Sequence, residues 1–281
     1  MHGGRRLGVA EWGPPSGQTL VWLHGTPGAR RQIPQEARLL AVERHVRVIG
    51  IDRPGVGLSD THLYDDIAGF MPDLELVVDQ LGVDRFSVVG LSGGGPYTLA
   101  AADHFGDRVP AVGVLGGVVP STGPYAVSGG LVGFAKQMAP IMPIVRRPMG
   151  AALTGFVRVM KPVGNQALEL YAKVSPPGDR EVLLRPEFRA MFLDDLTENG
   201  GRSMRAVIPD GILFTRDWGF DPTTITTPIH WWHGDADNIV PFAHAEQFVP
   251  RLKNATLYVR PGQSHLGGLS LGRDIFDAVL T

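Results

Sequence analysis

Short apolar runs that alternate with helical patterns constrain the fold of this chain more than any other feature of its sequence. The runs cover residues 18–24, 46–51, 86–91, 111–119, 228–233 and 255–260. Near-continuous runs of this kind, rich in β-branched residues, are typical of strands in a parallel sheet that is covered on both faces. Helices are expected between them, over residues 74–81, where the apolar spacing ends at Gly82, and over 96–102 and 242–252. Repeated strand–helix–strand units predict right-handed crossovers and a doubly wound, mostly parallel α/β sheet.

Residues 121–227 interrupt this alternation. The interval contains apolar helical stretches at 131–142, 149–160, 165–174 and 188–197, but no convincing alternating strand. A chain of 281 residues fits one large domain or a core that carries one inserted lobe. We therefore predict an α/β core formed by residues 1–120 and 228–281, with residues 121–227 inserted as a helical cap or lid.

Composition and charge exclude several classes of protein. The formal net charge of −2 argues against a nucleic-acid-binding protein, which usually carries a clear basic excess. Because the chain has no cysteine, it has no disulfide framework, thiolate metal site or cysteine nucleophile. Residues 1–13 lack an apolar stretch of signal-peptide length, which favours a cytoplasmic location, and no apolar run is long enough to span a bilayer as a helix.

The strongest local motif is a G-x-S-x-G at residues 90–94, directly after one predicted strand and before a predicted helix. A nucleophile on such a tight turn takes a strained backbone conformation that exposes its Oγ. The flanking glycines allow the strand and the helix to pack closely, and Pro96 suits the first helical turn, where its missing N–H costs nothing. The alternative is a glycine-rich turn with a capping serine. The strand–turn–helix context favours catalysis, with Ser92 as the nucleophile.

A nucleophilic serine requires a base, and nine histidines are available. His265 follows the last predicted strand, in a loop that can reach back over Ser92, and we expect it to be the base. His230 and His233 lie in or at the edge of a strand, where packing or turn roles suit them better, and His24 opens a turn as a structural hydrogen-bonding group. The remaining histidines fall in terminal, loop or surface-helix contexts, and we expect them to be solvated: His2, His45, His62, His104 and His244.

The acid that orients the base is expected in the loop after the 228–233 strand, which offers Asp235 and Asp237. Asp237 lies 28 residues before His265, one helix and one strand away, so that the two loops meet at the same edge of the sheet. Asp235 is better suited to capping or bracing the turn. The rival position, after the 111–119 strand, offers no carboxylate. We therefore predict Asp237 as the acid, with Asp235 as the fallback.

An oxyanion hole requires two preorganised backbone donors. One should be the N–H of Gly93, the residue after the nucleophile. The second should come from the turn at residues 24–28, where Pro27 has no N–H and Thr26 is therefore the better donor. The alternative for this turn is a plain strand–turn junction without a catalytic role.

The remaining motifs indicate no further chemistry. Residues 52–60 (DRPGVGLSD) combine charges and glycines in a pattern typical of a rigid loop held by internal hydrogen bonds. No phosphate-binding G-x-x-x-x-G-K-[ST] is present, and His230, His233 and Asp235 lack the spacing of a metal site. We therefore expect neither a metal nor another cofactor.

At these residues the sequence resembles the α/β-hydrolase superfamily, and in particular its capped serine-hydrolase branch of esterases, lipases, thioesterases and carbon–carbon bond hydrolases. The matching motifs occur in family order: HGTPG (24–28), DRPGVGLSD (52–60), GLSGGG (90–95), HGDADNIVP (233–241) and GQSH (262–265). The resemblance implies the α/β-hydrolase fold, a triad of Ser92, Asp237 and His265, and a lid formed by the 121–227 insertion. Serine at position 92 tells against the epoxide-hydrolase and haloalkane-dehalogenase branches, whose members use aspartate there. Only 17 residues precede the HGTPG strand, so the first hairpin of the family is expected to be reduced to one strand, 7–12.

The predicted lid is apolar, especially over residues 131–145. Such residues mostly form a lid's own core, but a lid also offers surface to a ligand, and methionines adapt to varied shapes. Between Arg108 and Leu168 every formal charge is positive. This pattern fits a solvated basic face, the interpretation that we favour, or else anionic or lipid-interface substrates with peripheral contact to lipid.

We therefore expect an esterase that cleaves carboxylic esters of a small-to-medium hydrophobic acyl substrate through an acyl-enzyme. The alternatives are a carbon–carbon bond hydrolase or a cofactor-free haloperoxidase-like enzyme on the same triad, and a non-catalytic small-molecule receptor on this fold.

Overall fold

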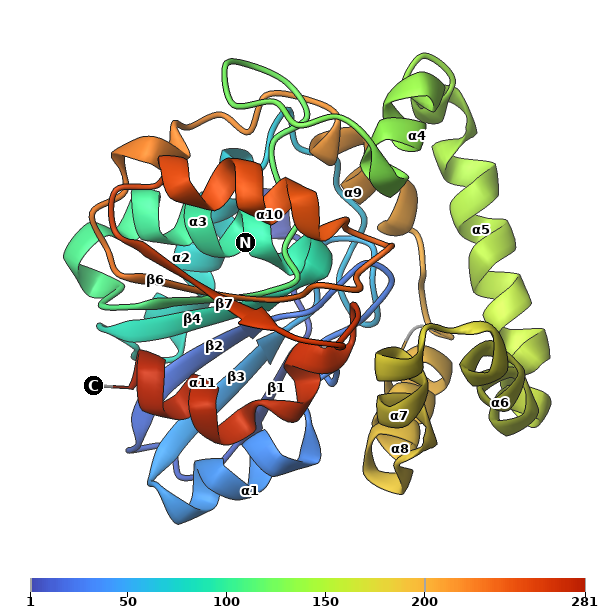
Figure 1. The fold of residues 1–281 in the computed structure, drawn as a ribbon, viewed down its shortest axis with the longest axis horizontal. Helices are drawn as coiled ribbons and strands as arrows, with labels where there is room; N and C mark the ends of the chain where they lie inside the picture. The colour runs from blue at the N-terminus through green and yellow to red at the C-terminus, as the bar shows by residue number, and fades with distance from the viewer. Residues whose placement is uncertain (1, 200, 281) are drawn as a thin grey trace.

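A seven-stranded sheet with helices on both faces forms the centre of the computed structural model, which describes residues 2–199 and 201–280 (Figure 1). The strand order is β1-β3-β2-β4-β5-β6-β7, with β1 antiparallel to β3 and every other neighbouring pair parallel. The strands are β1 Val9–Trp12, β2 Gln18–Leu23, β3 Val46–Ile51, β4 Phe86–Leu91, β5 Val112–Leu115, β6 Ile229–Gly234 and β7 Ala255–Arg260. The predicted, mostly parallel α/β sheet is thus confirmed. The first strand, expected over residues 7–12, is β1, which begins at Val9.

Helices cover the sheet on its two faces. In Figure 1, α1 (Gln35–Glu43) and α11 (Gly272–Val279) lie on one side, and α2 (Met71–Gln80), α3 (Gly95–Phe105) and α10 (Phe242–Phe248) lie on the other. Alternate residues of β2 enter two different clusters of buried side chains. Val21 and Leu23 pack with residues of α2 and α3, whereas Leu20 and Trp22 pack with residues of α1 and α11. Because both faces are buried, the strands read as continuous apolar runs.

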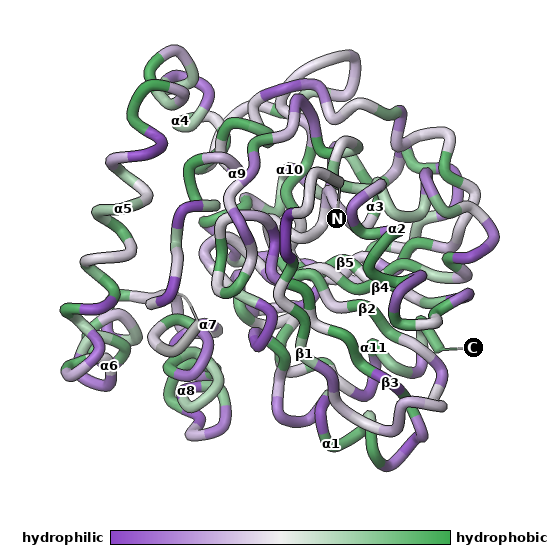
Figure 2. The backbone as a smooth tube through the Cα atoms, turned by 180° about the vertical axis from the view of Figure 1, so that it is seen from behind, coloured by the Kyte–Doolittle hydropathy of each residue, from purple (hydrophilic) through white to green (hydrophobic). Residues whose placement is uncertain are grey.

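The residues between β5 and β6, called here the helical segment, form α4 (Gly130–Met138), α5 (Met142–Met160), α6 (Gly164–Val174), α7 (Pro177–Leu184), α8 (Pro186–Leu193), a π-helix (Asp194–Asn199) and α9 (Val207–Phe214). Within its described part, this segment adds no strand to the sheet, and its one β contact is an isolated bridge between Met204 and Val56. The helices α4, α5 and α6 lie to one side of the core (Figure 1), and apolar and polar stretches alternate along α5 (Figure 2).

Several predicted boundaries in and near this segment are wrong. The strand expected over 111–119 ends at Leu115, because Gly116 takes a φ of 54° and turns the chain. The helix expected over 131–142 ends at Met138, and α5 begins at Met142 with Pro143 in its first turn. The helix expected over 188–197 ends at Leu193 and continues as the π-helix.

No helix within residues 2–199 and 201–280 combines the length and the hydropathy that crossing a bilayer requires.

Candidate active site

Ser92 lies on a strained turn at the end of the central strand β4. A short 3₁₀ turn, Ser92–Gly94, separates β4 from α3, and Ser92 has a φ of 52°. Positive φ is costly for a residue with a side chain and is retained where the surroundings enforce it. The backbones are packed too closely here for larger residues: a Cβ on Gly94 would come within 2.3 Å of the Leu23 carbonyl oxygen, and one on Gly90 within 2.6 Å of Gly94. The local sequence therefore forces the chain to present Ser92 at the rim of the sheet.

His265 and Asp237 meet at the same rim. Asp237 lies in the loop after β6 and His265 in the loop after β7, and His265 Nδ1 is 2.7 Å from Asp237 Oδ2. The other carboxylate oxygen of Asp237 accepts hydrogen bonds from the N–H groups of Ile239, at 2.8 Å, and Val240, at 3.0 Å. Burial opposes ionisation of this carboxyl, but hydrogen bonds from His233 and His265 outweigh it and hold the pKa of Asp237 below its usual range.

His233 is a second imidazole on Asp237 that sequence analysis did not assign to the site. Its Nδ1 accepts a hydrogen bond from Trp231 Nε1 at 3.2 Å, so the proton sits on Nε2. That Nε2 donates to the Val240 carbonyl oxygen at 2.8 Å and lies 3.3 Å from Asp237 Oδ2. The sequence signal that could have revealed this contact is the spacing of four residues between His233 and Asp237, on either side of one turn.

Asp235, the fallback acid, has a different partner. Its Oδ1 accepts a hydrogen bond from the Gly262 N–H at 2.8 Å, at an exposed position. It joins the loop after β6 to the loop after β7, which matches the bracing role expected of it. Asp237, and not Asp235, contacts His265.

His244 corrects an expectation about the histidines. It was expected to be solvated on a helix surface, but its side chain is buried on the inner side of α10, and its Nε2 is 3.1 Å from the Ser128 carbonyl oxygen. Packing of α10 against the start of the helical segment, which local periodicity does not show, accounts for the difference.

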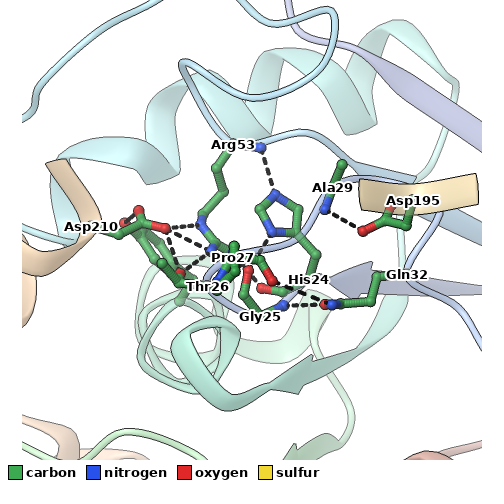
Figure 3. A network of polar contacts seen from close by, with 10 residues as sticks. His24, Gly25, Thr26, Pro27, Ala29, Gln32, Arg53, Asp195 and Asp210 are labelled. Carbon is green, nitrogen blue, oxygen red and sulfur yellow. Dashed lines mark hydrogen bonds and ion pairs between the residues drawn. The ribbon is translucent and has the colours of Figure 1, made fainter. Parts of the chain in front are cut away.

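The HGTPG turn after β2 places Thr26 beside Gly93. A Cβ on Gly93 would lie 2.5 Å from Thr26 Oγ1, so the two proposed oxyanion residues come from turns in direct contact. Thr26 Oγ1 donates to Asp210 Oδ2 at 2.6 Å and accepts from Arg53 Nη2 at 2.8 Å (Figure 3). The hydroxyl of Thr26 therefore donates one hydrogen bond and accepts another, and these two bonds orient its side chain.

Arg53 holds the HGTPG turn in place through several hydrogen bonds. Its buried guanidinium bonds Asp210 Oδ2 at 2.8 Å and the Gly25 carbonyl oxygen at 3.1 Å, and it also donates to the His24 carbonyl oxygen. Its backbone N–H donates to His24 Nε2 at 3.1 Å, which leaves the proton of His24 on Nδ1, bonded to Gly25 (Figure 3). Burial, together with the charge of Arg53, lowers the pKa of His24 well below its ordinary value. The DRPGVGLSD loop, expected only to hold itself rigid, thus also braces the HGTPG turn.

One cavity of about 500 Å³ contains Ser92, His265 and Thr26 in its wall. Among the described residues that line it, none is an aspartate, glutamate, lysine or arginine. The rest of the wall is mostly apolar and comes largely from the helical segment, including Leu131, Phe156, Met160, Ala167, Leu183 and Phe192. A group bound beside Ser92 would therefore lie mostly against apolar side chains.

Across the described part of the chain, no group of three or more histidine, aspartate or glutamate side chains is arranged to hold a metal ion.

Comparison with known proteins identifies several that are similar to this chain. A family model described as the alpha/beta hydrolase fold matches residues 18–137. A non-heme haloperoxidase from Rhodococcus erythropolis is 29% identical over 99% of this chain and 95% of the relative, and a non-heme chloroperoxidase from Burkholderia pyrrocinia is 28% identical over 96% and 92%. Among solved structures, an esterase from Exiguobacterium antarcticum superposes with a TM-score of 0.68 at 22% identity, covering 99% of this chain and 97% of the esterase.

Proposed function

The chain belongs to the α/β-hydrolase superfamily, and on that premise we propose that it is a serine hydrolase of the capped branch, cleaving carboxylic esters of small-to-medium hydrophobic acyl groups. The observation that carries the proposal is the 2.7 Å contact between His265 and Asp237, at a cavity whose wall also contains Ser92. The fixed order of nucleophile, acid and histidine along the chain supports it further.

The proposed reaction uses these three side chains in two steps. Ser92 Oγ attacks the ester carbonyl carbon while its proton passes to His265 Nε2, because Nδ1 is already bonded to Asp237. The imidazolium then gives this proton to the departing alkoxide, which leaves as an alcohol. Water attacks the acyl-serine in the same way, releases the carboxylic acid and restores the hydroxyl of Ser92.

Two further features contribute to this chemistry. The N–H groups of Gly93 and Thr26 are proposed to bind the oxyanion, at turns that are already in contact and held by Arg53 and Asp210. The low pKa of Asp237 keeps its carboxylate charged, and this charge stabilises the imidazolium as it forms.

The uncharged cavity indicates the substrate class. Burying a charged acyl chain against this wall would leave the charge without a partner, whereas an apolar chain gains by leaving water. We propose residues 121–227 as a cap that supplies much of this wall, over a core formed by residues 1–120 and 228–281.

A second candidate is a cofactor-free haloperoxidase-like activity on the same triad, which the two haloperoxidase relatives favour. It is distinguished by halogenation of a 1,3-diketone probe in the presence of peroxide and halide. A carbon–carbon bond hydrolase would instead prefer a vinylogous diketone to p-nitrophenyl esters.

The main test is the variant Ser92→Ala, assayed with p-nitrophenyl esters and with a fluorophosphonate label. We expect the wild-type protein to turn over the esters and to be labelled, and the variant to be folded, unlabelled and inactive. Residual turnover above about a thousandth of the wild-type rate would contradict the role of Ser92. A folded wild-type protein that is neither labelled nor active would support a non-catalytic receptor instead.

A further inference from the structure

Three buried carboxylates of the helical segment form hydrogen bonds with loops of the core. Asp210 of α9 bonds Thr26 and Arg53, as described above. Asp195 of the π-helix accepts hydrogen bonds from the N–H groups of Ala29, at 2.8 Å, and Arg31, at 3.1 Å, just beyond the HGTPG turn (Figure 3). The third, Asp179, lies in the first turn of α7 and bonds the loop of His265.

Asp179 holds both chain neighbours of His265. Its Oδ1 accepts a hydrogen bond from the Leu266 N–H at 2.7 Å, and its Oδ2 accepts one from the Ser264 hydroxyl at 3.1 Å. The side chain of Asp179 is fully buried, with 0% exposure. The backbones also approach closely, because a Cβ on Gly178 would come within 2.8 Å of Ser264 N. The start of α7 is therefore fitted to the histidine loop.

A carboxylate suits this position for a chemical reason. Both of its oxygens accept hydrogen bonds, so it can bind the donors on either side of His265 at once, whereas an asparagine has one acceptor oxygen and could contact Ser264 only by reversing that hydrogen bond, with its NH₂ group as the donor. Burial raises the pKa of Asp179, and the hydrogen bond from Leu266 and the proximity of His265 act against this increase. A buried carboxyl group is costly unless it is well bonded, and here both partners belong to the loop of the base.

We propose that Asp179 is a positioning residue through which the helical segment fixes the place of His265 relative to Ser92. This inference rests on the proposed function, since it assumes that His265 is the base. By bonding the residues before and after His265, Asp179 restricts the loop backbone, and Asp237 fixes the ring. The segment would then be a structural part of the catalytic site as well as its cover.

The test compares Asp179→Asn with Glu181→Gln, which replaces an exposed carboxylate on the same helix that does not line the cavity of Ser92. We expect kcat of Asp179→Asn on a p-nitrophenyl ester to fall by about ten- to a hundredfold, because a displacement of the order of 1 Å costs that much. KM should change less than kcat, because the apolar wall remains, and Glu181→Gln should match the wild type in both constants.

A milder variant keeps the test decisive if Asp179→Asn does not fold. Ser264→Ala removes one of the two bonds and leaves the Leu266 N–H bond to Asp179 in place. We expect a several-fold lower kcat and a broadened or shifted low-field NMR signal of the His265 Nδ1 proton, which a role limited to docking α7 would not change. Wild-type kcat and an unchanged signal in Ser264→Ala would overturn the proposal.

The two proposals fail in different ways. If Ser92→Ala is inactive while folded Asp179→Asn and Ser264→Ala keep the wild-type kcat, only the positioning role of Asp179 is lost. If Ser92→Ala retains turnover, the proposed function itself is wrong.

Discussion

The two aspartates of the loop after β6 lie two residues apart and have different partners. Asp237 is buried and bonds His265, His233 and two backbone N–H groups, whereas the side chain of Asp235 is exposed and accepts a hydrogen bond from the Gly262 N–H. An oriented imidazole needs an ionised acceptor on its Nδ1 side, and Asp237 is the carboxylate placed to provide it.

Replacing each aspartate by asparagine should therefore have unequal effects. We expect Asp237→Asn to lower kcat by about 10⁴-fold, because the amide can stabilise the wrong tautomer of His265. Asp235→Asn should change kcat by only a few-fold, since it perturbs one bond of the turn. Ester turnover of the two purified variants measures the ranking, and the reverse order would move the acid to Asp235.

Residues with local signals could be predicted, and residues that act through distant contacts could not. Ser92 was marked by its glycine neighbours, and His265 and Asp237 by their positions after predicted strands. Asp179 carries no local signal, since its partners lie 85 and 87 residues further along the chain. Arg53 was assigned to a rigid loop from the charges and glycines around it, and its bond to Asp210 was missed because it spans 157 residues.

At the scale of elements, strands of the sheet were easier to predict than helices of the helical segment. A strand buried on both faces is apolar throughout, but α7 and α9 have eight residues each and contain Pro or Gly. Helices of this length are not stable alone and form through tertiary contacts, here those of Asp179 and Asp210. Periodicity alone therefore could not show them.

The helix α6 should set the length of acyl chain that the cavity accepts. Ala167 lines the cavity, and its neighbour Gln166 is exposed and does not. We expect Ala167→Phe to fill part of the cavity and lower kcat/KM for long acyl esters at least about tenfold more than for acetate esters, an effect worth roughly 1.4 kcal/mol. A series of p-nitrophenyl esters of increasing chain length measures this change.

Gln166→Phe is the matched control, because it adds the same ring one residue away, outside the cavity. Its chain-length profile should follow that of the wild type. Equal profiles for Ala167→Phe and Gln166→Phe would mean that this cavity does not hold the acyl group.

At the scale of the whole molecule, the buried titratable groups make stability depend on pH in opposite directions. Burial lowers the pKa of His24, His62, His230 and His244. Burial raises the pKa of Asp52, Asp179 and Asp195. Histidines whose pKa is lowered on folding disfavour the folded state in acid, because the unfolded chain takes up protons that the folded chain does not, whereas these aspartates act with the opposite sign.

His24 allows one of these contributions to be isolated. Its pKa is well below 6.5 in the folded state. The contribution of neutral His24 to stability is therefore fully present above pH 6.5, and it is lost as the pH falls toward the folded-state pKa, because the unfolded chain then takes up a proton that the folded chain does not. One such group changes the free energy of unfolding by at most about 1.4 kcal/mol per pH unit. In His24→Asn the loss of the bond to Arg53 should destabilise the fold near neutral pH.

The gap in free energy of unfolding between wild type and His24→Asn should therefore narrow as the pH falls from about 7.5 to about 5, because only the wild type loses the contribution of His24. Urea unfolding of both proteins at several pH values in this range measures the gap, and the other titrating groups cancel in the difference. His45→Asn is the control for the same replacement at another position, because this exposed histidine contacts Ser16 and not Arg53. A gap for His24→Asn that stays constant over this pH range would mean that His24 is not held neutral within the HGTPG turn.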